Sequence, residues 1–207
     1  MSHNIPVMDP RQARSRARLH EAVLRLAAEQ PIAELSMTAV AAAAGVHRST
    51  VYQHAGSVDE LLQQALGAEL DQLRTGLPAP GAPPAEAARA VTAVTRGVLE
   101  HVARHAGLYR AGLAAGDADH GLRGMLGRHF LESGRLLREV SGVAPSLDVP
   151  GQPQAAVAEV AARFIADGTV GVIAAWLDRP ELSVDDLLEI YVRLLPDWWP
   201  RDLTAGE

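Results

Sequence analysis

The chain has 207 residues, of which 48% are hydrophobic and 21% are charged, so it is long and apolar enough to fold around a core. It contains no cysteine, which excludes disulfides and thiol chemistry. The formal net charge of −6 is unusual for a nucleic-acid-binding protein, but it is unevenly distributed. Residues 1–56 hold six arginines and four acidic residues, whereas acidic residues predominate in the remainder. A weakly basic head on an acidic body would orient the head toward a polyanion.

The first predicted helix covers residues 9–29. Asp9 is a suitable N-cap, and a proline follows at the first helical position, where it is favoured. Leu19, Val23 and Leu26 recur at helical spacing and form the expected core face. A different face carries four arginines that are either phosphate contacts or an ordinary solvated face: Arg11, Arg14, Arg18 and Arg25.

Two short helices joined by a tight turn are predicted within residues 36–54. Ser36 is an N-cap for a helix made mostly of alanine, and Gly45 ends that helix because glycine adopts a left-handed C-cap without steric penalty. The second helix extends from about Arg48 to His54, and neither it nor its flanking turns contain an acidic residue. From the residues alone, this segment is either a DNA-binding helix or a solvated corner of a helical domain, and the absence of acidic residues favours DNA.

The run A-A-A-A-G-V-H-R-S-T-V-Y-Q-H-A-G-S-V-D-E-L-L, residues 41–62, resembles the helix-turn-helix of TetR-family transcriptional regulators. Gly-Val, Thr-hydrophobic-Tyr and a following His occur together in the family's register. Ala55 replaces the family's usual phenylalanine, and Val58 replaces its usual lysine. The resemblance implies that the DNA contacts are made by Thr38, His47, Arg48, Ser49, Thr50, Tyr52 and His54, with Arg11, Arg14 and Arg18 on phosphates beside the groove.

The resemblance also implies a fold and a function. The expected fold is all-α, with a three-helix DNA-binding domain over residues 1–56 and a helical effector-binding and dimerisation domain over residues 57–207. The expected function is that of a ligand-responsive regulator, most often a repressor, which binds a palindromic site in double-stranded DNA as a homodimer and needs no cofactor. The alternative is a helical small-molecule or partner-binding protein that does not bind DNA. An enzyme is disfavoured, since the sequence has no phosphate-binding loop, nucleophile motif or paired-carboxylate motif.

The body of the chain is predicted to be helical throughout, apart from loops rich in proline and glycine at residues 76–84 and 142–153. Ser57 and Glu60 have the spacing of a capping box at the start of the connecting helix. Helical spacing predicts helices over residues 57–74, 85–105, 107–115, 119–141, 154–178 and 184–195.

The two terminal helices, near residues 154–178 and 183–195, are apolar on more of their surface than one chain can cover. Gly168, Gly171 and Ala175 form a smooth strip on the first of them. We expect these helices to form a four-helix bundle between the two chains of a homodimer, and the alternative is that both are internal core.

Candidate ligand-binding residues are the aromatic and histidine side chains of the body, which could equally be core. They are His105, Tyr109, Phe130, Phe164 and Trp176, with His129 as a further polar group.

His101 and His105 stand four residues apart on one predicted helix, a spacing that can chelate a metal. No cysteine and no clearly placed carboxylate accompany them, so no metal site is predicted.

The first ten residues lack the apolar stretch of a signal peptide. The longest apolar run, residues 168–177, is shorter than the about 20 residues that span a bilayer. A cytoplasmic protein without membrane contact is therefore expected.

Overall fold

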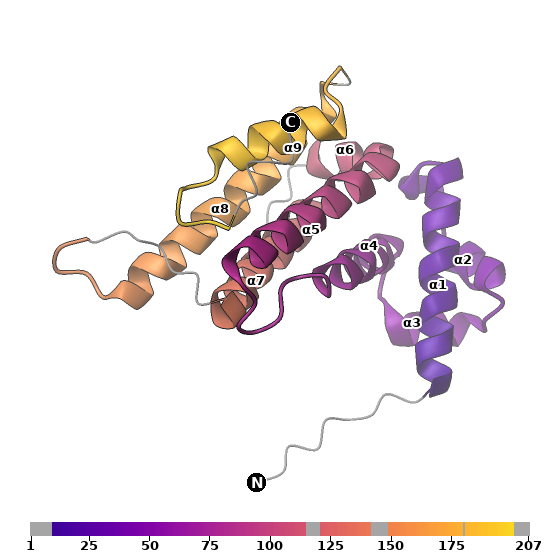
Figure 1. Cartoon of the computed structure of the whole chain (residues 1–207). Coiled ribbons are helices and arrows are strands. Elements are labelled where there is room, and N and C mark those ends of the chain that lie inside the picture. Colours follow the sequence, from indigo (N-terminus) through magenta and orange to yellow (C-terminus); the bar gives the residue numbers. More distant parts are fainter. Residues whose placement is uncertain (1–9, 115–120, 142–148, 180, 201–207) are drawn as a thin grey trace, which may run out of the picture. The chain divides into compact units, whose positions relative to one another are not determined.

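The computed structural model describes residues 10–114, 121–141, 149–179 and 181–200, which contain helices and no strand (Figure 1). The predicted all-α fold is confirmed. The elements are α1 (Pro10–Glu29), η1 (Ile32–Glu34), α2 (Met37–Ala44), α3 (Arg48–His54), α4 (Val58–Arg74), α5 (Pro84–Arg104), α6 (Ala106–Ala114), α7 (Leu122–Ser141), α8 (Gln154–Leu177) and α9 (Val184–Leu194).

The chain divides into two compact units, and the division falls inside α4, between Ala68 and Glu69. The helix itself continues without a break through this point. The functional boundary expected at Gly56 therefore stays a prediction, and α4 supplies residues to both units.

The first unit is built from α1, α2, α3 and the beginning of α4. Its core consists of apolar side chains at helical spacing on each of these helices, and the outer faces are polar on α1, α3 and α4 and mostly alanine on α2. The fully buried residues include Leu19, Val23, Val40, Val51, Leu61 and Leu66. Leu26, predicted for the same core, is half-buried.

Most helix ends lie within a few residues of the predicted ones, since they are set by local caps. Ser36 accepts a hydrogen bond from the Ala39 amide at 3.1 Å, and Ser183 and Asp186 form a complete capping box at the start of α9. The capping box predicted at Ser57 is only partly present. The Ser57 hydroxyl accepts a hydrogen bond from the Glu60 amide at 3.1 Å. The Glu60 carboxylate accepts one from the Gly56 amide at 2.7 Å, whereas a complete capping box would have it accept from the Ser57 amide. The predicted cap Asp9 lies outside the described residues, as does position 119, where the predicted helix 119–141 begins.

The second unit contains α5 to α9 and the end of α4. Here α7 packs along α8, and α5 packs along α9 (Figure 1). Arg110 on α6 donates two hydrogen bonds to the Leu177 carbonyl, at 3.1 and 2.6 Å, and so satisfies the C-terminal end of α8.

Among the described helices, α8 is the one long and apolar enough to cross a bilayer, by length and composition only. The window that meets this test contains charged residues ahead of the uninterrupted apolar run at residues 168–177. Core helices of soluble proteins meet the same test. One side of α8 packs on α7, and 33% of the apolar window is buried inside the chain.

Gly45 is required by the turn between α2 and α3. Its φ of 62° is in the left-handed region, where its amide donates to the Ala42 carbonyl and the next amide, of Val46, donates to the Ala41 carbonyl. A side chain at this position would meet no neighbouring atom, so any cost of substitution comes from the backbone conformation.

We predict that Gly45→Ala lowers the free energy of unfolding by roughly 1–2 kcal/mol, because a Cβ atom disfavours the left-handed conformation. Gly107→Ala is the matched control, since Gly107 has no positive φ and also has open space at its Cβ. The control should change stability by less than about 1 kcal/mol, in the stabilising direction. Urea unfolding followed by circular dichroism measures both variants, and equal effects would contradict the prediction.

Candidate functional site

The turn between α2 and α3 fixes the direction in which α3 leaves the core of the first unit. His47 caps α3: its Nδ1 atom accepts from the Ser49 amide at 3.3 Å and lies 2.8 Å from the Ser49 hydroxyl. Val51 is fully buried and anchors the inner face of α3. The short helix is therefore held at one end by a cap and in its middle by a core contact, and its other side chains lie on the surface.

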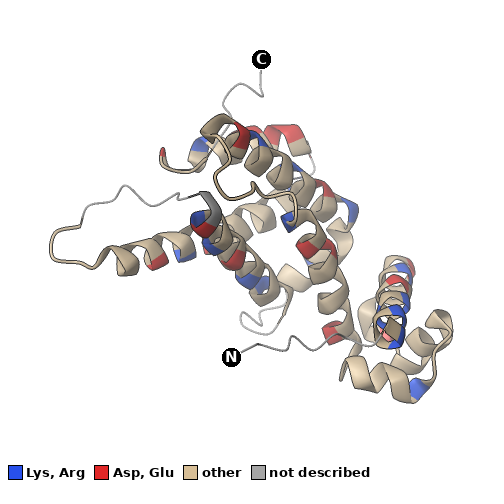
Figure 2. Ribbon diagram, turned by 60° about the horizontal axis from the view of Figure 1, so that its bottom comes forward, with Lys and Arg blue, Asp and Glu red and all other residues tan. Residues whose placement is uncertain are grey.

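The outer face of α3 carries hydroxyl, imidazole, phenol and guanidinium groups and no carboxylate. No residue of α2 or α3 is coloured as acidic in Figure 2. Tyr52 is 49% exposed, and the Arg48 guanidinium carbon lies 5.6 Å from the centre of its ring. This cation–π contact holds the two side chains together at the surface. Of the residues expected to contact DNA, Thr38, His47, Arg48, Ser49 and Tyr52 are exposed, whereas Thr50 and His54 are half-buried.

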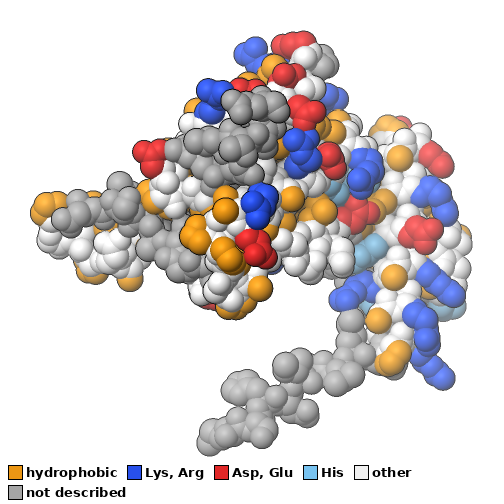
Figure 3. Space-filling view, viewed as in Figure 1, with side chains coloured by type: hydrophobic (Ala, Val, Ile, Leu, Met, Phe, Trp, Pro, Cys, Tyr) orange, Lys and Arg blue, Asp and Glu red, His pale blue; other side chains and the backbone are white. Residues whose placement is uncertain are grey.

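The arginine stripe of α1 lies on the surface of the same unit. Arg11, Arg14, Arg18 and Arg25 are all exposed, and basic side chains line this unit in the space-filling view (Figure 3). Arg25 donates to the Ala43 carbonyl at 3.4 Å, so the last arginine of the stripe reaches α2. The exposed cations of α1 and the acid-free surface of α3 therefore belong to one folded unit.

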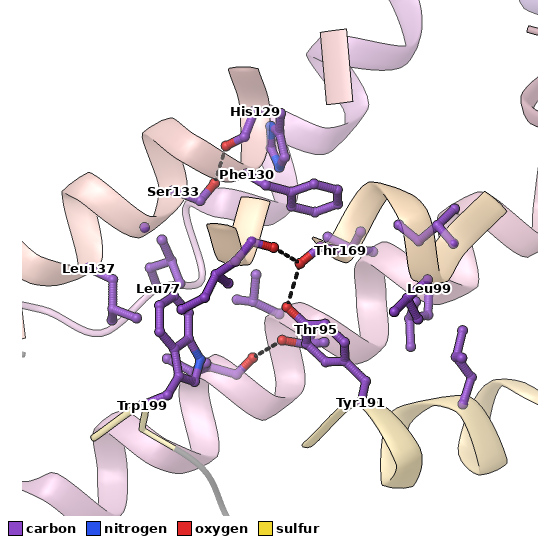
Figure 4. A pocket seen from close by; sticks show the side chains of 18 residues that line it. Leu77, Thr95, Leu99, His129, Phe130, Ser133, Leu137, Thr169, Tyr191 and Trp199 are labelled. Carbon is purple, nitrogen blue, oxygen red and sulfur yellow. Dashed lines mark hydrogen bonds between the residues drawn. The ribbon is translucent and has the colours of Figure 1, made fainter. Parts of the chain in front are cut away.

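The second unit encloses an apolar cavity of about 80 Å³ between α5, α7, α8 and α9 (Figure 4). Its wall is formed mainly by valine, leucine and isoleucine side chains, with Phe130 on one side and Trp199 beside Leu77 on another. Polar side chains reach the wall at five positions: Thr95, His129, Ser133, Thr169 and Tyr191.

Most of these hydroxyl groups are already satisfied within the wall. Thr95 donates to the Val91 carbonyl at 2.8 Å, and Ser133 donates to the His129 carbonyl at 2.8 Å. Thr169 donates to the Ile165 carbonyl at 2.7 Å, so its contact of 2.8 Å with the Tyr191 hydroxyl has Tyr191 as the donor. The cavity thus offers few free donors and suits a guest that is largely apolar.

His129 joins this cavity to the end of α4. Its Nδ1 atom lies 2.7 Å from the Arg74 guanidinium and 3.4 Å from the Asp71 carboxylate. Arg74 also pairs with Asp71 at 2.9 Å and with Glu132 at 3.2 Å. Burial, followed by the charge of Arg74, lowers the pKa of His129 to about 4, so the ring is neutral at pH 7 and its Nδ1 accepts from the guanidinium.

A known protein family matches a segment that lies within the first unit. Residues 19–65 match the family model described as bacterial regulatory proteins, tetR family. The chain has the helix-turn-helix domain of the TetR family. This match confirms the resemblance seen in residues 41–62.

Solved structures of TetR-family regulators share the whole fold. A TetR transcriptional regulator from Rhodococcus sp. RHA1 has a TM-score of 0.60 and 22% identity, covering 88% of this chain and 94% of its own. The TetR-family repressor FadR from Thermus thermophilus, solved with lauroyl-CoA, has a TM-score of 0.58 and 24% identity, covering 93% and 99%. NalD, a repressor of a multidrug efflux pump in Pseudomonas aeruginosa, has a TM-score of 0.51 and 20% identity, covering 91% and 100%. No curated protein sequence matches the chain significantly.

Within this TetR-like body, the five predicted ligand-binding residues occupy different places. Phe130 lines the cavity, whereas Phe164 is 78% exposed on α8. Trp176 is buried and donates from its indole to the Leu182 carbonyl at 2.8 Å. Tyr109 is fully buried and bonds to a histidine, and His105 lies beside Glu69. The structure thus brings Phe130 and His129 together and separates them from the other four residues.

Thr169 and Tyr191 are among the cavity residues that the sequence did not indicate. Tyr191 lies at helical spacing with the leucines of α9, and Thr169 follows Gly168 in the strip of small residues on α8. The available signal was a polar group at a buried helical position in each case. Pairing them required knowledge of how α8 and α9 pack.

We predict that acid weakens the fold of this TetR-like chain partly through His129. Between its ordinary pKa of 6.5 and its folded value of about 4, the unfolded chain binds a proton that the folded chain does not, so stability is present above pH 6.5 and is lost as the pH falls. This residue should account for about 2 kcal/mol of the stability lost between pH 7 and pH 5.

His129→Gln provides the test, because glutamine keeps an acceptor for Arg74 and does not titrate. Urea unfolding at pH 7 and pH 5 should show a smaller loss in His129→Gln than in the parent chain, by about 2 kcal/mol. The same substitution at exposed His47 is the control and should leave the parent difference unchanged. A parent-like loss in His129→Gln would show that this histidine is not responsible.

Proposed function

We propose that the protein is a ligand-responsive transcriptional regulator, of the repressor type, which binds a palindromic DNA site as a homodimer. The observation that carries this proposal is the surface of α3: a capped, anchored helix whose exposed side chains include Arg48, Ser49 and Tyr52 and no acid. Such a helix fits the major groove, whose base edges accept and donate hydrogen bonds. Acting on DNA, the protein would work in the cytoplasm.

The roles of the individual residues follow from their chemistry and exposure. Arg48, Ser49 and Tyr52 are exposed and suited to base edges or the backbone beside them. Two half-buried residues, Thr50 and His54, have only their tips available, which suits contacts to phosphate oxygens. The remaining phosphate contacts are assigned to Thr38, His47, Arg11, Arg14 and Arg18.

The second proposed component is a small, largely apolar effector in the cavity of the C-terminal unit. Lauroyl-CoA, bound by the FadR of Thermus thermophilus, carries an apolar chain of the kind that this wall would accept. The cavity of about 80 Å³ is far below the roughly 300–1,000 Å³ of typical ligand sites, so a guest would have to widen it.

Widening of the cavity gives a physical route to regulation. His129 lines the cavity and is bonded to Arg74 near the end of α4. A guest that displaces His129 would disturb this buried pair, and α4 is a single helix that begins at Val58 in the other unit. A coupling of about 1–3 kcal/mol is sufficient to change DNA occupancy.

The proposed dimer surface lies on α8 and α9. Val160 and Phe164 on α8 are 71% and 78% exposed, and Leu194 on α9 is 66% exposed. These three side chains line one open groove of about 570 Å³. Gly168 and Gly171 belong to the strip of small residues on α8. A Cβ atom added at either position would meet no neighbouring atom, so another helix could approach closely.

A helical ligand-binding protein that does not bind DNA is the second candidate. Val58, at the position of the family's usual lysine, is buried, so the corresponding phosphate contact is absent from this chain. Affinity for DNA would then depend more heavily on the arginines of α1. The binding measurements below separate the two candidates.

We predict that Arg48→Ala and Tyr52→Ala each weaken binding to a specific duplex by about 1–3 kcal/mol, because each removes a contact from the groove-facing helix. The duplex would be selected by this protein from randomised DNA, and affinity measured by fluorescence anisotropy. Arg14→Ala should weaken binding to all sequences and reduce the slope of log K against log salt by about 1. The control, exposed Arg89→Ala on α5, should bind like the parent. Failure to select any duplex would favour the non-DNA-binding candidate.

We predict that the parent chain is a dimer at micromolar concentration and that Phe164→Asp raises the dimer dissociation constant at least about tenfold, because a carboxylate would be buried at the interface. Ala155→Asp places the same charge at an exposed position of α8 that does not line the proposed dimer groove, and this variant should remain dimeric. Size-exclusion chromatography with light scattering gives both masses. A monomeric parent chain would refute the proposed interface.

A further inference from the structure

Two histidines and a glutamate converge in the C-terminal unit, away from the apolar cavity. His101 and His105 lie on α5, and Glu69 lies on α4. The Glu69 Oε2 atom is 3.1 Å from His101 Nδ1 and 3.2 Å from His105 Nε2. All three atoms lie within 4.8 Å of one another. The helical spacing supplied the histidine pair, and the fold supplies the carboxylate that the sequence did not indicate.

These separations fit the first coordination shell of a transition metal. Bonds of about 2.0–2.1 Å at a tetrahedral angle place neighbouring donor atoms about 3.3 Å apart. The two distances from Glu69 are close to this value, and the two histidine nitrogens, which lie within 4.8 Å of each other, complete the set. Two imidazoles and one carboxylate form a donor set that Zn²⁺ uses in sites with an open fourth position.

The orientation of His101 supports the same interpretation. This side chain is 1% exposed, and its Nε2 atom lies 2.8 Å from the Tyr109 hydroxyl. If Nε2 donates to the phenol oxygen, Nδ1 keeps a lone pair aimed at the cluster, as in metal sites whose histidines are oriented by an outer partner.

The opposite arrangement, in which the phenol donates to Nε2, would place a proton on Nδ1 facing Glu69. However, Nδ1 is a buried atom with no aligned hydrogen-bond partner, although Glu69 is close. The Glu69 carboxylate is already within hydrogen-bond distance of His105 Nε2, at 3.2 Å, and His101 Nδ1 lies 3.1 Å from the same oxygen without being aligned for a hydrogen bond. A cation bound among the three atoms would give the Nδ1 lone pair a partner and would be shared by the carboxylate and both rings.

We propose that Glu69, His101 and His105 bind a divalent transition metal ion of the Zn²⁺ class, with Tyr109 orienting His101. Access is from the side of Glu69, whose side chain is 40% exposed, while His101 closes the inner side. The fourth position is open to water or to an anionic group. The site is formed entirely within the C-terminal unit, so metal binding does not depend on the proposed DNA-binding function.

A regulatory consequence rests on that proposed function. The metal would join α4 to α5 at Glu69, two residues before Asp71 and five before Arg74, which bond His129 on α7. The metal would thus act on the end of α4 through Glu69, and the apolar effector would act on the same end through His129 and Arg74. We expect Zn²⁺ to change the affinity of the chain for its DNA duplex.

The direct test uses the untagged full-length chain, treated with chelator and then dialysed. Titration with Zn²⁺ against a fluorescent chelator should give one site per chain with a micromolar or lower dissociation constant, and Mg²⁺ should not compete. Co²⁺ should produce the intense visible absorption of a tetrahedral site. Weak binding at several sites, as expected from the eight histidines of the chain acting independently, would refute the proposal.

The variants separate direct ligands from orienting and unrelated residues. His105→Gln and Glu69→Gln should each weaken Zn²⁺ binding more than about tenfold, and Tyr109→Phe should weaken it by about 10–100-fold through the outer shell. His47→Gln, in the other unit, is the matched control and should bind Zn²⁺ like the parent. Circular dichroism melting without metal shows that each variant is folded, and parent-like Zn²⁺ affinity in folded His105→Gln and Glu69→Gln would refute the site.

DNA-binding measurements with and without Zn²⁺ distinguish the two proposals. A metal-dependent change in duplex affinity that is lost in His105→Gln supports the regulatory role. Zn²⁺ binding at the site with unchanged duplex affinity overturns that role and leaves the site. If the metal binds and no duplex is recognised, the proposed DNA-binding function fails and the site again stands.

Discussion

The end of α4 carries charged residues up to the apolar interior of the C-terminal unit, and this constraint organises the packing around it. A buried charge is tolerated only when partners replace its water, and Arg74 has three of them: Asp71, Glu132 and His129. Glu69, one turn earlier, faces His101 and His105 in the same way. The charged end of α4 therefore fixes α5 and α7 around it through polar contacts with defined geometry, which apolar packing alone would not impose.

Both proposed effector sites act on these contacts. The cavity reaches α4 through His129, and the histidine–glutamate cluster reaches it through Glu69. Polar contacts of this kind are directional, and breaking one leaves a largely buried polar group without its partner, which costs free energy. A helix held by such contacts at one end and belonging to the helix-turn-helix unit at its other end is a physically reasonable element for transmitting a ligand signal.

The terminal helices show a different arrangement. Their inner faces are buried, and α8 in addition exposes Val160 and Phe164 beside a strip of small residues. Such a patch is rarely left uncovered, and the dimer proposed above would cover it with the same patch of a second chain. The sequence indicated the excess of apolar surface, but Phe164 was also a candidate for the ligand pocket. On a helix that is apolar on most of its surface, the sequence does not tell whether an aromatic side chain points inward or outward.

The sequence by itself determined the helices, their caps and the helix-turn-helix, because these depend on residues within one or two turns of each other. Ser36, Gly45 and Ser183 set helix ends through contacts spanning three or four residues, and the acid-free segment around Arg48 was visible without coordinates. Only the tertiary structure decided which distant groups meet. Glu69 joins His101, and Tyr191 joins Thr169, through packing between helices that are separated along the chain. Helical periodicity gives each residue a face but does not specify the neighbour opposite it, so these sites appear only once the helices are packed.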